Sequence, residues 1–377
     1  MPRRRWLHVF STFDVGGPQV RACQLMNIWG DAIEHHVASA NAGQYAARAL
    51  VEPVVPLAIV DDLAPFKGPA LPVRLWKIGQ ALARSDYDLV LTYNWGAIEV
   101  ALANRLLARV PLVHHEDGFG PDEAAGTLPR RDLIRRLALP GAGAVVACSR
   151  RIEQLALTRW GQSTARVHYV PNGVDVLAFD RHPAPDAIPG LTRRPGDLVV
   201  GTMAGLRPEK NLRRLVRAFA LATRGRGNVR LVIAGKGVEE AGIRAEAQAY
   251  GVADQLLLPG YLRDPARYVG LFDVFAISSD TEQFPISLVE AMAARLPAIC
   301  TDVGDIADIV ATENSPYVVP ATDEAALARG LERLLADAEL RHRIGNANRV
   351  RVESQFSQQR MVESYRAIYA EVGGIGW

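Results

Sequence analysis

The stretch DLVVGTMAGLRPEKNLRRLVRAFA, residues 197 to 220, contains one complete unit of regular structure. It begins with a short apolar run and continues through a loop that contains glycine and proline. Apolar residues then recur at helical spacing, at Leu212, Leu215, Val216 and Phe219. A strand buried on both faces and followed by a helix is the building block of a parallel sheet. The stretch therefore predicts an α/β fold.

The same alternation continues in both directions along the chain of 377 residues. The earlier apolar runs are WLHVFSTF, HHVASA, VVPLAIV, DLVLTYN, PLVHHED, AVVACS and RVHYVPN, and the later ones are VRLVIAG, QLLLPGY, VFAISS, PAICT and PYVVP. A Pro-rich, charged segment separates the two series and is typical of a linker. We predict two doubly wound, Rossmann-like domains that face each other across a cleft, with ligands beyond the carboxyl ends of the strands. The predicted limits are 1–175 for the first domain, 176–196 for the linker, 197–355 for the second domain and 356–377 for a C-terminal helix that crosses back to the first.

The composition is that of a soluble globular protein, with 49% hydrophobic and 22% charged residues. No run approaches the roughly 20 apolar residues of a membrane span. We interpret the basic N-terminus, MPRRRWLHVFSTF, as leading into a first strand rather than as a signal peptide, and expect a cytoplasmic protein. The net charge of +2 is too small to indicate nucleic-acid binding. Cys23, Cys148 and Cys300 have apolar neighbours and wide spacing, which favours reduced core thiols.

Two loops that follow predicted strands are candidate phosphate sites. Gly16 and Gly17 lie where the first strand gives way to a helix, so the backbone there can approach an anion, although a plain tight turn also uses glycine. Arg207 and Lys210 lie in the loop of the opening stretch. Surface cations are often merely solvated. Lysine is scarce in this chain, however, which favours a diphosphate contact over that alternative. The four lysines are Lys67, Lys77, Lys210 and Lys236.

A third candidate lies in SSDTEQFPISLVEAMAARLPAICTDVG, residues 278 to 304. Pro285 suits the first position of a helix, which leaves the amides of the next residues, Ile286 to Leu288, available to a phosphate. Glu282 and Glu290 flank that helix start. Carboxylates repel a diphosphate, so we expect them to accept hydrogen bonds from neutral hydroxyls. A diphosphate between hydroxyl-rich rings describes a nucleotide-sugar.

With these motifs the chain resembles the family 4 retaining glycosyltransferases of the GT-B fold. The resembling residues are GG at 16 and 17, VPNGVD at 170 to 175, LRPEKN at 206 to 211, AGKG at 234 to 237, and the pair Glu282 and Glu290 followed by AMAARLPAICTDVG. The resemblance covers nearly the whole chain and is stronger in its second half.

The resemblance implies roles for the matching positions. Glu290 would hold the ribose hydroxyls and Glu282 the donor-sugar hydroxyls, while Lys210 and a nearby arginine would neutralise the leaving diphosphate. The backbone at Gly16 and Gly17 would close over it, and no metal or other cofactor is expected. The donor site would also include the family positions Gly205, Gly235, Phe284, Pro285, Ile286 and Ser287.

The chain departs from the family pattern at two places. The family usually has arginine at the position of Gly205, so Arg207 is predicted to supply that charge. A family histidine near the reacting carbon is replaced by the run His114, His115, Glu116, Asp117, and we predict that Asp117 or one of the two histidines is the site residue. Neighbouring strand residues point to opposite faces, which argues against a metal site in this run.

The segment LPRRDLIRRLALPG predicts a helix that opens at Pro129 and ends before Pro140. Its arginines, Arg131, Arg135 and Arg136, are predicted on one side and its leucines on the other. Such a helix is either an ordinary half-buried helix or a contact with an anionic membrane that carries the acceptor.

The sequence thus predicts a cytoplasmic, metal-independent, retaining hexosyltransferase, with an acceptor-side first domain and a nucleotide-sugar-binding second domain. It would move a sugar from a nucleoside diphosphate sugar to a hydroxyl of a glycan or lipid-linked intermediate in bacterial surface polysaccharide assembly, at the inner face of the cell membrane. The alternatives are a catalytically inactive GT-B scaffold and a GT-B nucleotide-sugar epimerase.

Overall fold

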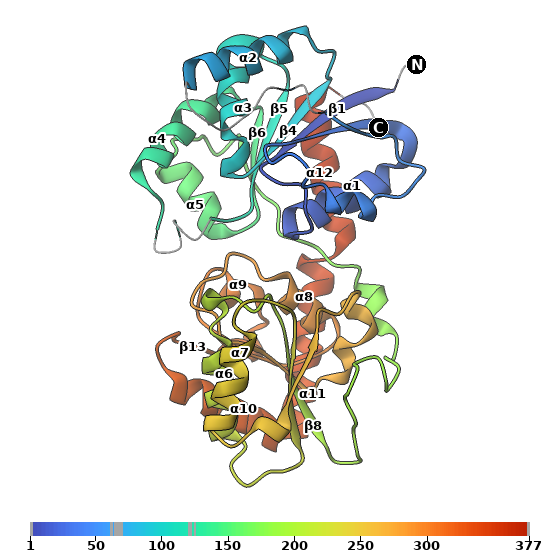
Figure 1. Cartoon of the computed structure of the whole chain (residues 1–377), viewed down its shortest axis with the longest axis vertical. Coiled ribbons are helices and arrows are strands. Elements are labelled where there is room, and N and C mark those ends of the chain that lie inside the picture. Colours follow the sequence, from blue (N-terminus) through green and yellow to red (C-terminus); the bar gives the residue numbers. More distant parts are fainter. Residues whose placement is uncertain (1–2, 61–62, 64–70, 120–122, 124–125, 375–377) are drawn as a thin grey trace. The chain divides into compact units, whose positions relative to one another are not determined.

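The computed structural model describes residues 3–60, 63, 71–119, 123 and 126–374, and the chain divides into two compact units. The first unit contains residues 1–171 and 361–377, and the second contains residues 172–360. Figure 1 shows a sheet flanked by helices in each. All the apolar runs quoted above form strands, which confirms the predicted α/β fold.

The first unit is built on a parallel sheet with the strand order β3-β2-β1-β4-β5-β6-β7. The direction of strand succession reverses between β1 and β4, and in doubly wound folds ligands bind beyond the carboxyl ends of strands at such a point. The strands are β1 (Arg4–Phe10), β2 (Ile33–Ser39), β3 (Leu57–Ile59), β4 (Leu89–Tyr93), β5 (Leu112–Glu116), β6 (Ala144–Ala147) and β7 (Val167–Tyr169).

The second unit repeats this plan with the order β10-β9-β8-β11-β12-β13, again all parallel. Its reversal lies between β8 and β11, so the loops that follow these two strands are neighbours. The strands are β8 (Leu198–Met203), β9 (Val229–Ala234), β10 (Leu256–Gly260), β11 (Val274–Ile277), β12 (Ala298–Thr301) and β13 (Val318–Val319).

Helices bury apolar stripes against the sheets. In α6 the predicted positions Leu212, Leu215, Val216 and Phe219 are all buried, and they belong to the core of the second unit. The helices of the first unit are α1 (Gly17–Trp29), α2 (Leu71–Arg84), α3 (Ile98–Ala103), α4 (Pro129–Ala138) and α5 (Arg150–Thr158). Those of the second are α6 (Leu212–Ala222), α7 (Glu240–Ala249), α8 (Ile286–Ala293), α9 (Ile306–Ile309), α10 (Glu324–Ala336) and α11 (Ala338–Gln355).

The last helix, α12 (Gln358–Gly373), leaves the second unit and packs in the first. Its residues Tyr365 and Tyr369 are buried in the same core cluster as Trp6 of β1 and Trp29 of α1. In Figure 1 α12 lies on the α1 side of the first sheet. Residues 176–196, predicted as a linker, fall in the second unit, where η7 (Val176–Asp180) packs against α8.

Two further findings concern the chain as a whole. Cys23, Cys148 and Cys300 are buried and form no disulfide within the described residues, as predicted. In the residues that the structure describes, none of the helices has the length and apolar character needed to cross a membrane.

Candidate functional site

Lys210 and Glu282 meet at the carboxyl edge of the second sheet. Lys210 ends the short helix η8 (Pro208–Lys210) after β8, and Glu282 lies in the loop after β11. The Lys210 Nζ atom lies 2.6 Å from Oε1 of Glu282, which also accepts a 2.7 Å hydrogen bond from the Ser279 hydroxyl. Lys210, Glu282 and Ser287 line a small pocket of about 20 Å³. The reversal of strand order therefore brings together residues 72 positions apart.

The loop after β8 packs closely against Gly235, which follows β9, and has more room at its own Gly205. A Cβ atom at Gly235 would come within 1.8 Å of the Ala204 carbonyl oxygen, so only glycine fits there. At Gly205 a Cβ atom would lie 3.4 Å from Nε of Arg207, which places the Arg207 side chain beside the position that carries arginine in the resembling family. Arg207 is exposed and pairs with Glu209 at 3.0 Å. Its guanidinium therefore remains accessible to a ligand.

Helix α8 starts one residue later than predicted. Pro285 is the N-cap rather than the first helical residue, and α8 runs from Ile286. No side chain caps this helix, and the Leu288 amide donates a 3.0 Å hydrogen bond to the Pro285 carbonyl oxygen. The Leu288 amide is therefore not available to a phosphate, and the predicted set is reduced to the amides of Ile286 and Ser287. Phe284 is buried against Phe356, with ring centroids 5.5 Å apart, so its side chain belongs to the core.

Glu290 lies on α8, partly covered, and its carboxyl has no hydrogen bond or ion pair within the described residues. Burial and the nearby Asp264 carboxylate raise its pKa to about 8. Asp264 and Tyr268 line a cavity of about 480 Å³ in the second unit. A carboxyl group without a protein partner beside such a cavity is a candidate ligand contact.

In the first unit α1 begins within the Gly16–Gly17 pair, at Gly17. Gly16 is the N-cap and no side chain caps the first amides of the helix. A Cβ atom at Gly17 would meet nothing within 4 Å, so the backbone is open at this point. The pair lies at the carboxyl end of β1, beside the reversal of strand order. This geometry suits an anion at the helix N-terminus.

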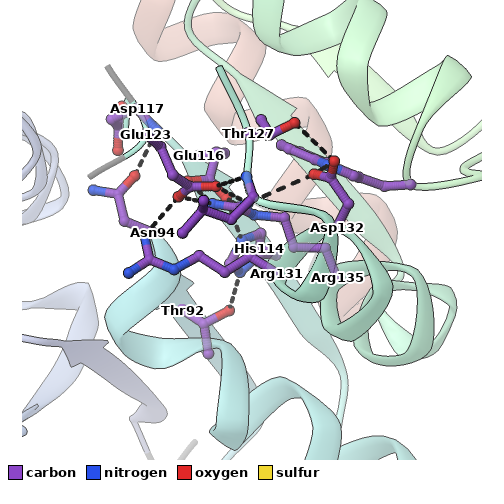
Figure 2. Close-up of polar contacts among 12 residues, drawn as sticks. Thr92, Asn94, His114, Glu116, Asp117, Glu123, Thr127, Arg131, Asp132 and Arg135 are labelled. Atoms are coloured by element: carbon purple, nitrogen blue, oxygen red, sulfur yellow. Dashed lines mark hydrogen bonds and ion pairs between the residues drawn. The ribbon is translucent and has the colours of Figure 1, made fainter. Parts of the chain in front are cut away.

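Asp117 follows β5 and is held by a partner that the sequence did not indicate. Arg21 of α1 donates two hydrogen bonds to the Asp117 carboxylate, and the Nη2–Oδ2 distance is 2.9 Å. Both side chains are more than 90% buried, at 4% and 8% exposure. The Asp117 amide donates a 2.6 Å hydrogen bond to Oδ1 of Asn94, which follows β4 (Figure 2). Asp117 is therefore a fixed, charge-paired group.

His114 and His115 point to opposite faces of β5, as the strand argument predicted. His115 is 1% exposed, and its Nε2 lies 2.7 Å from the Tyr369 hydroxyl while Nδ1 lies 3.1 Å from the Thr92 carbonyl oxygen. Burial, followed by the charge of Arg21, holds the pKa of His115 well below its usual value. The His115 imidazole is therefore enclosed among its partners, and the proposed site below does not rely on it.

The prediction for α4 was correct in its limits but wrong in its faces. Arg135 is fully buried, whereas Leu133 and Leu137 are 58% and 50% exposed. Arg135 donates to Glu116 and Glu123, and Arg131 also donates to Glu123, at 2.7 Å (Figure 2). The Arg135 guanidinium lies over the Trp160 and Trp95 rings, 4.8 Å and 5.2 Å from their centroids. Of the three predicted membrane arginines only Arg136 is exposed.

The residues that the sequence did not reveal share a cause. Arg21 and Asn94 act on Asp117 from 96 and 23 positions away in the chain. Ser279 was passed over because serine is common in loops. One signal could have pointed to such residues: polar side chains follow the carboxyl ends of the strands beside the reversal of strand order.

Comparisons with known proteins agree with the fold. The model for Glycosyl transferases group 1 matches residues 185–351, and that for the Glycosyl transferase 4-like domain matches residues 16–173. Among solved structures, sucrose-phosphate synthase from Thermosynechococcus elongatus has a TM-score of 0.78 at 21% identity and covers 98% of this chain and 100% of its own. Anabaena HepE in complex with UDP and glucose has a TM-score of 0.80 at 20% identity, with 98% and 100% coverage.

Curated relatives match over shorter stretches. The putative glycosyltransferase EpsD of Bacillus subtilis is 30% identical over 223 residues, which is 58% of this chain and 58% of EpsD. The capsular polysaccharide biosynthesis glycosyltransferase CapM of Staphylococcus aureus is 27% identical over 46% of each chain. The matched part thus spans about half the length of these relatives. Together, the two domain matches and the shared architecture show that the chain belongs to the family 4 glycosyltransferases of the GT-B fold.

Proposed function

We propose that this chain moves a sugar from a nucleoside diphosphate sugar to a hydroxyl acceptor, with retention of anomeric configuration and without a metal ion. The acceptor is proposed to be a glycan or lipid-linked intermediate of surface polysaccharide assembly, on the cytoplasmic side of the membrane. The name of CapM, a capsular polysaccharide biosynthesis glycosyltransferase, supports this class of pathway. The proposal rests chiefly on the contact of Lys210, Glu282 and Ser279 at the reversal of strand order.

The Lys210–Glu282 pair supplies opposite charges at one point, which suits a ligand with an anionic and a hydroxyl-bearing part. In the proposed complex Lys210 and Arg207 contact the diphosphate, and Glu282 accepts hydrogen bonds from the donor sugar. The amides of Ile286 and Ser287 at the start of α8 add to the diphosphate contact.

The nucleoside is assigned to the region of Glu290. Burial raises the pKa of the Glu290 carboxyl to about 8, and a ribose diol that donates hydrogen bonds to the carboxylate would favour its ionised form. The 480 Å³ cavity lined by Asp264 and Tyr268 has the size of ordinary small-molecule sites and supports a nucleoside nearby.

The chemistry needs no protein nucleophile in this proposal. The bond between the anomeric carbon and the diphosphate oxygen breaks, and the electron pair leaves with the diphosphate. Lys210, Arg207 and the helix-start amides stabilise the charge that develops there. The acceptor oxygen bonds to the anomeric carbon on the face that the diphosphate leaves, and its proton passes to the departing diphosphate. Asp117, held by Arg21, orients the first-unit residues around the acceptor instead of taking that proton.

A thermal-shift panel of UDP, GDP, ADP and their common sugar conjugates, with and without EDTA, tests the site. A ligand that binds only the native state adds RT ln(1 + [L]/Kd) to the free energy of unfolding, about 2.7 kcal/mol at 100 times Kd, and so raises the melting temperature. We expect one nucleotide to do so, unchanged by EDTA. A shift that EDTA abolishes contradicts metal independence, and no shift with any nucleotide contradicts the proposal.

The nucleotide identified in this way then allows the reaction to be followed. Incubation of its sugar conjugate without acceptor should give slow hydrolysis, and NMR of the released sugar should first show the donor's anomer. An inactive scaffold would give no hydrolysis, and an epimerase would convert the donor sugar without any acceptor. Either result would replace the proposed reaction while leaving the nucleotide site intact.

A further inference from the structure

The first unit carries a group of exposed apolar side chains on three neighbouring helical segments. These segments are α2, α4 and η4 (Asn104–Ala108), a π-helical turn that continues α3. We call this group the α2–α4 surface; its members, with their exposed fractions, are Leu71 41%, Val73 54%, Trp76 56%, Leu106 58%, Leu107 45%, Leu133 58% and Leu137 50%. Single exposed leucines are ordinary, whereas seven large apolar side chains on adjacent elements require an explanation.

Contacts within the unit join these segments into one layer. A Cβ atom at Gly79 of α2 would collide with the Leu107 side chain at 2.4 Å, so η4 lies directly on α2. The Arg105 guanidinium donates to the Leu137 carbonyl oxygen, which ties η4 to the end of α4. Helix α3 packs against both α2 and α4, and Figure 1 shows the three helices together on one side of the first sheet. The exposed apolar residues therefore lie on one helical layer.

The charge of this layer has one sign. Residues 71–85, 100–115 and 133–152 contain no aspartate and no glutamate. The exposed cations in these ranges are Lys77, Arg84, Arg105, Arg109, Arg136, Arg150 and Arg151, of which Arg150 pairs with Glu153 at 2.8 Å. The carboxylates that directly flank these ranges are paired within the protein. Asp86 binds Arg5 at 2.6 Å, Glu99 binds Arg74 at 2.8 Å, Glu116 binds Arg135 at 3.2 Å and Glu153 binds Arg150 at 2.8 Å, while Asp132 accepts from Trp160 and Thr127. The α2–α4 surface therefore presents apolar side chains among uncompensated positive charges.

Two of these cations line a cavity of about 500 Å³ at the end of η4. Arg105 and Arg109 form its polar part, and Pro111, Pro140 and Val372 contribute apolar walls. Arg109 has a left-handed backbone conformation, with φ of 62°, which is uncommon for a residue other than glycine. The π-helical turn and this conformation together direct the chain so that both guanidinium groups border one hollow. Such a hollow fits a phosphate-bearing head group.

We propose that the α2–α4 surface docks on a bilayer that contains anionic lipids. The leucines and Trp76 would enter the boundary between head groups and acyl chains, the cations would contact lipid phosphates, and the Arg105–Arg109 hollow would hold one head group. A basic surface for nucleic acid does not need exposed leucine, whereas an anionic bilayer is contacted by apolar side chains and cations together, so the combination favours a lipid surface. The proposal moves the membrane contact from Arg131 and Arg135 to the opposite face of α4.

Co-sedimentation of the full chain with vesicles tests this directly, and it does not depend on any transfer reaction. One kind of vesicle contains phosphatidylcholine alone, and the other contains about 30% of the anionic lipid phosphatidylglycerol in phosphatidylcholine. We expect binding to the second kind only, weakened by high salt because exposed charges are screened. Equal binding to both kinds, or none to either, overturns the proposal.

Two sets of variants separate the charged and apolar parts. The charge set is Lys77→Gln, Arg109→Asn and Arg136→Gln; asparagine is chosen at 109 because it tolerates the left-handed conformation. We expect the partition coefficient to fall about fivefold for each cation removed. The apolar set is Trp76→Gln, Leu106→Gln and Leu133→Gln, and we expect a fall of about tenfold or more.

Matched control sets lie in the second unit. They are Arg224→Gln, Arg333→Gln and Arg343→Gln for charge, and Val238→Gln, Tyr250→Gln and Val350→Gln for exposed apolar side chains. We expect these controls to bind vesicles like the unmodified chain. Equal losses in control and test sets overturn the proposal. A second outcome also overturns it: the unmodified chain is a dimer without lipid, and the apolar variants are monomers that still bind vesicles. The α2–α4 surface would then join two copies of the chain.

Discussion

The two units use buried or partly buried charge in opposite ways. In the second unit Lys210 and Glu282 form an accessible pair, with side chains 16% and 11% exposed, and Glu290 has no protein partner in the described residues. In the first unit Arg135 and its carboxylates Glu116 and Glu123 are fully enclosed, with every group hydrogen-bonded. In the second unit some hydrogen-bonding groups therefore remain available to a ligand, whereas in the first unit they are all bonded within the protein.

This difference is more informative than residue type. Both clusters contain the charged side chains expected of an active site, and both lie near the carboxyl edge of a parallel sheet. Completeness of hydrogen bonding separates them, because a satisfied network resists rearrangement while an unsatisfied carboxyl favours a ligand. The comparison predicts that changes in the first unit act on stability and changes in the second act on turnover.

The largest expected effect is the loss of stability on removing the central cation of the enclosed network. Arg135→Met leaves Glu116 and Glu123 buried with too few positive charges, and breaking a buried pair in this way costs about 3–5 kcal/mol. All six tryptophans lie in residues assigned to the first unit, so urea unfolding followed by tryptophan fluorescence reports on that unit. The exposed Arg136→Met on the same helix is the control and should change stability by less than about 0.5 kcal/mol. Similar losses in both variants would contradict the contrast.

The next effect concerns the accessible pair. Lys210→Ala removes one preorganised charge from the proposed diphosphate contact and should lower transfer by about 10²-fold or more, with little change in unfolding. Arg224→Ala, an exposed cation elsewhere in the second unit, is the matched control. Turnover is measured with the donor identified by thermal shift. Near-normal turnover of the Lys210 variant would contradict its assignment.

Acid should weaken the first unit selectively. Burial lowers the pKa of His35 to about 3, and it also holds the pKa values of His8 and His115 well below their usual value. The unfolded chain binds these protons below about pH 6.5 while the native unit does not, so stability is fully present above that pH and falls below it. Each such histidine contributes a slope of about 1.4 kcal/mol per pH unit.

The measurement compares two probes between pH 7.5 and 5. Tryptophan fluorescence should show the melting temperature of the first unit falling with pH. The histidines in the second unit, His182 and His342, are exposed. The melting of that unit, seen as the part of the far-UV circular dichroism transition that has no counterpart in tryptophan fluorescence, should therefore change less. A flat fluorescence melting temperature over this range would show that the buried imidazoles do not set the acid stability of the first unit.

The sequence predicted much of this architecture but only part of the contrast. Buried strands appear in the sequence as continuous apolar runs, so the fold could be predicted from local pattern. Loops that follow neighbouring strands lie close together, so the region of Lys210 and Glu282 could be predicted as well. The burial of Arg135 did not, because an amphipathic pattern treats arginine as solvated, and its carboxylate partners come from β5 and the following loop. Arg21 was missed for the same reason, since an ion pair between distant residues leaves no periodic signal.

The smallest of these effects tests the departure at Gly205. The Arg207 side chain lies beside the position where the family has arginine, and it is exposed, so its pair with Glu209 contributes little to stability. If Arg207 supplies the missing charge, Arg207→Gln should lower transfer about tenfold without changing the melting temperature. Gly205→Arg in that background should restore most of the loss, because a Cβ atom there meets only the Arg207 side chain at 3.4 Å. Unchanged transfer in the Arg207→Gln variant would instead assign the diphosphate charge to Lys210 and the α8 amides alone.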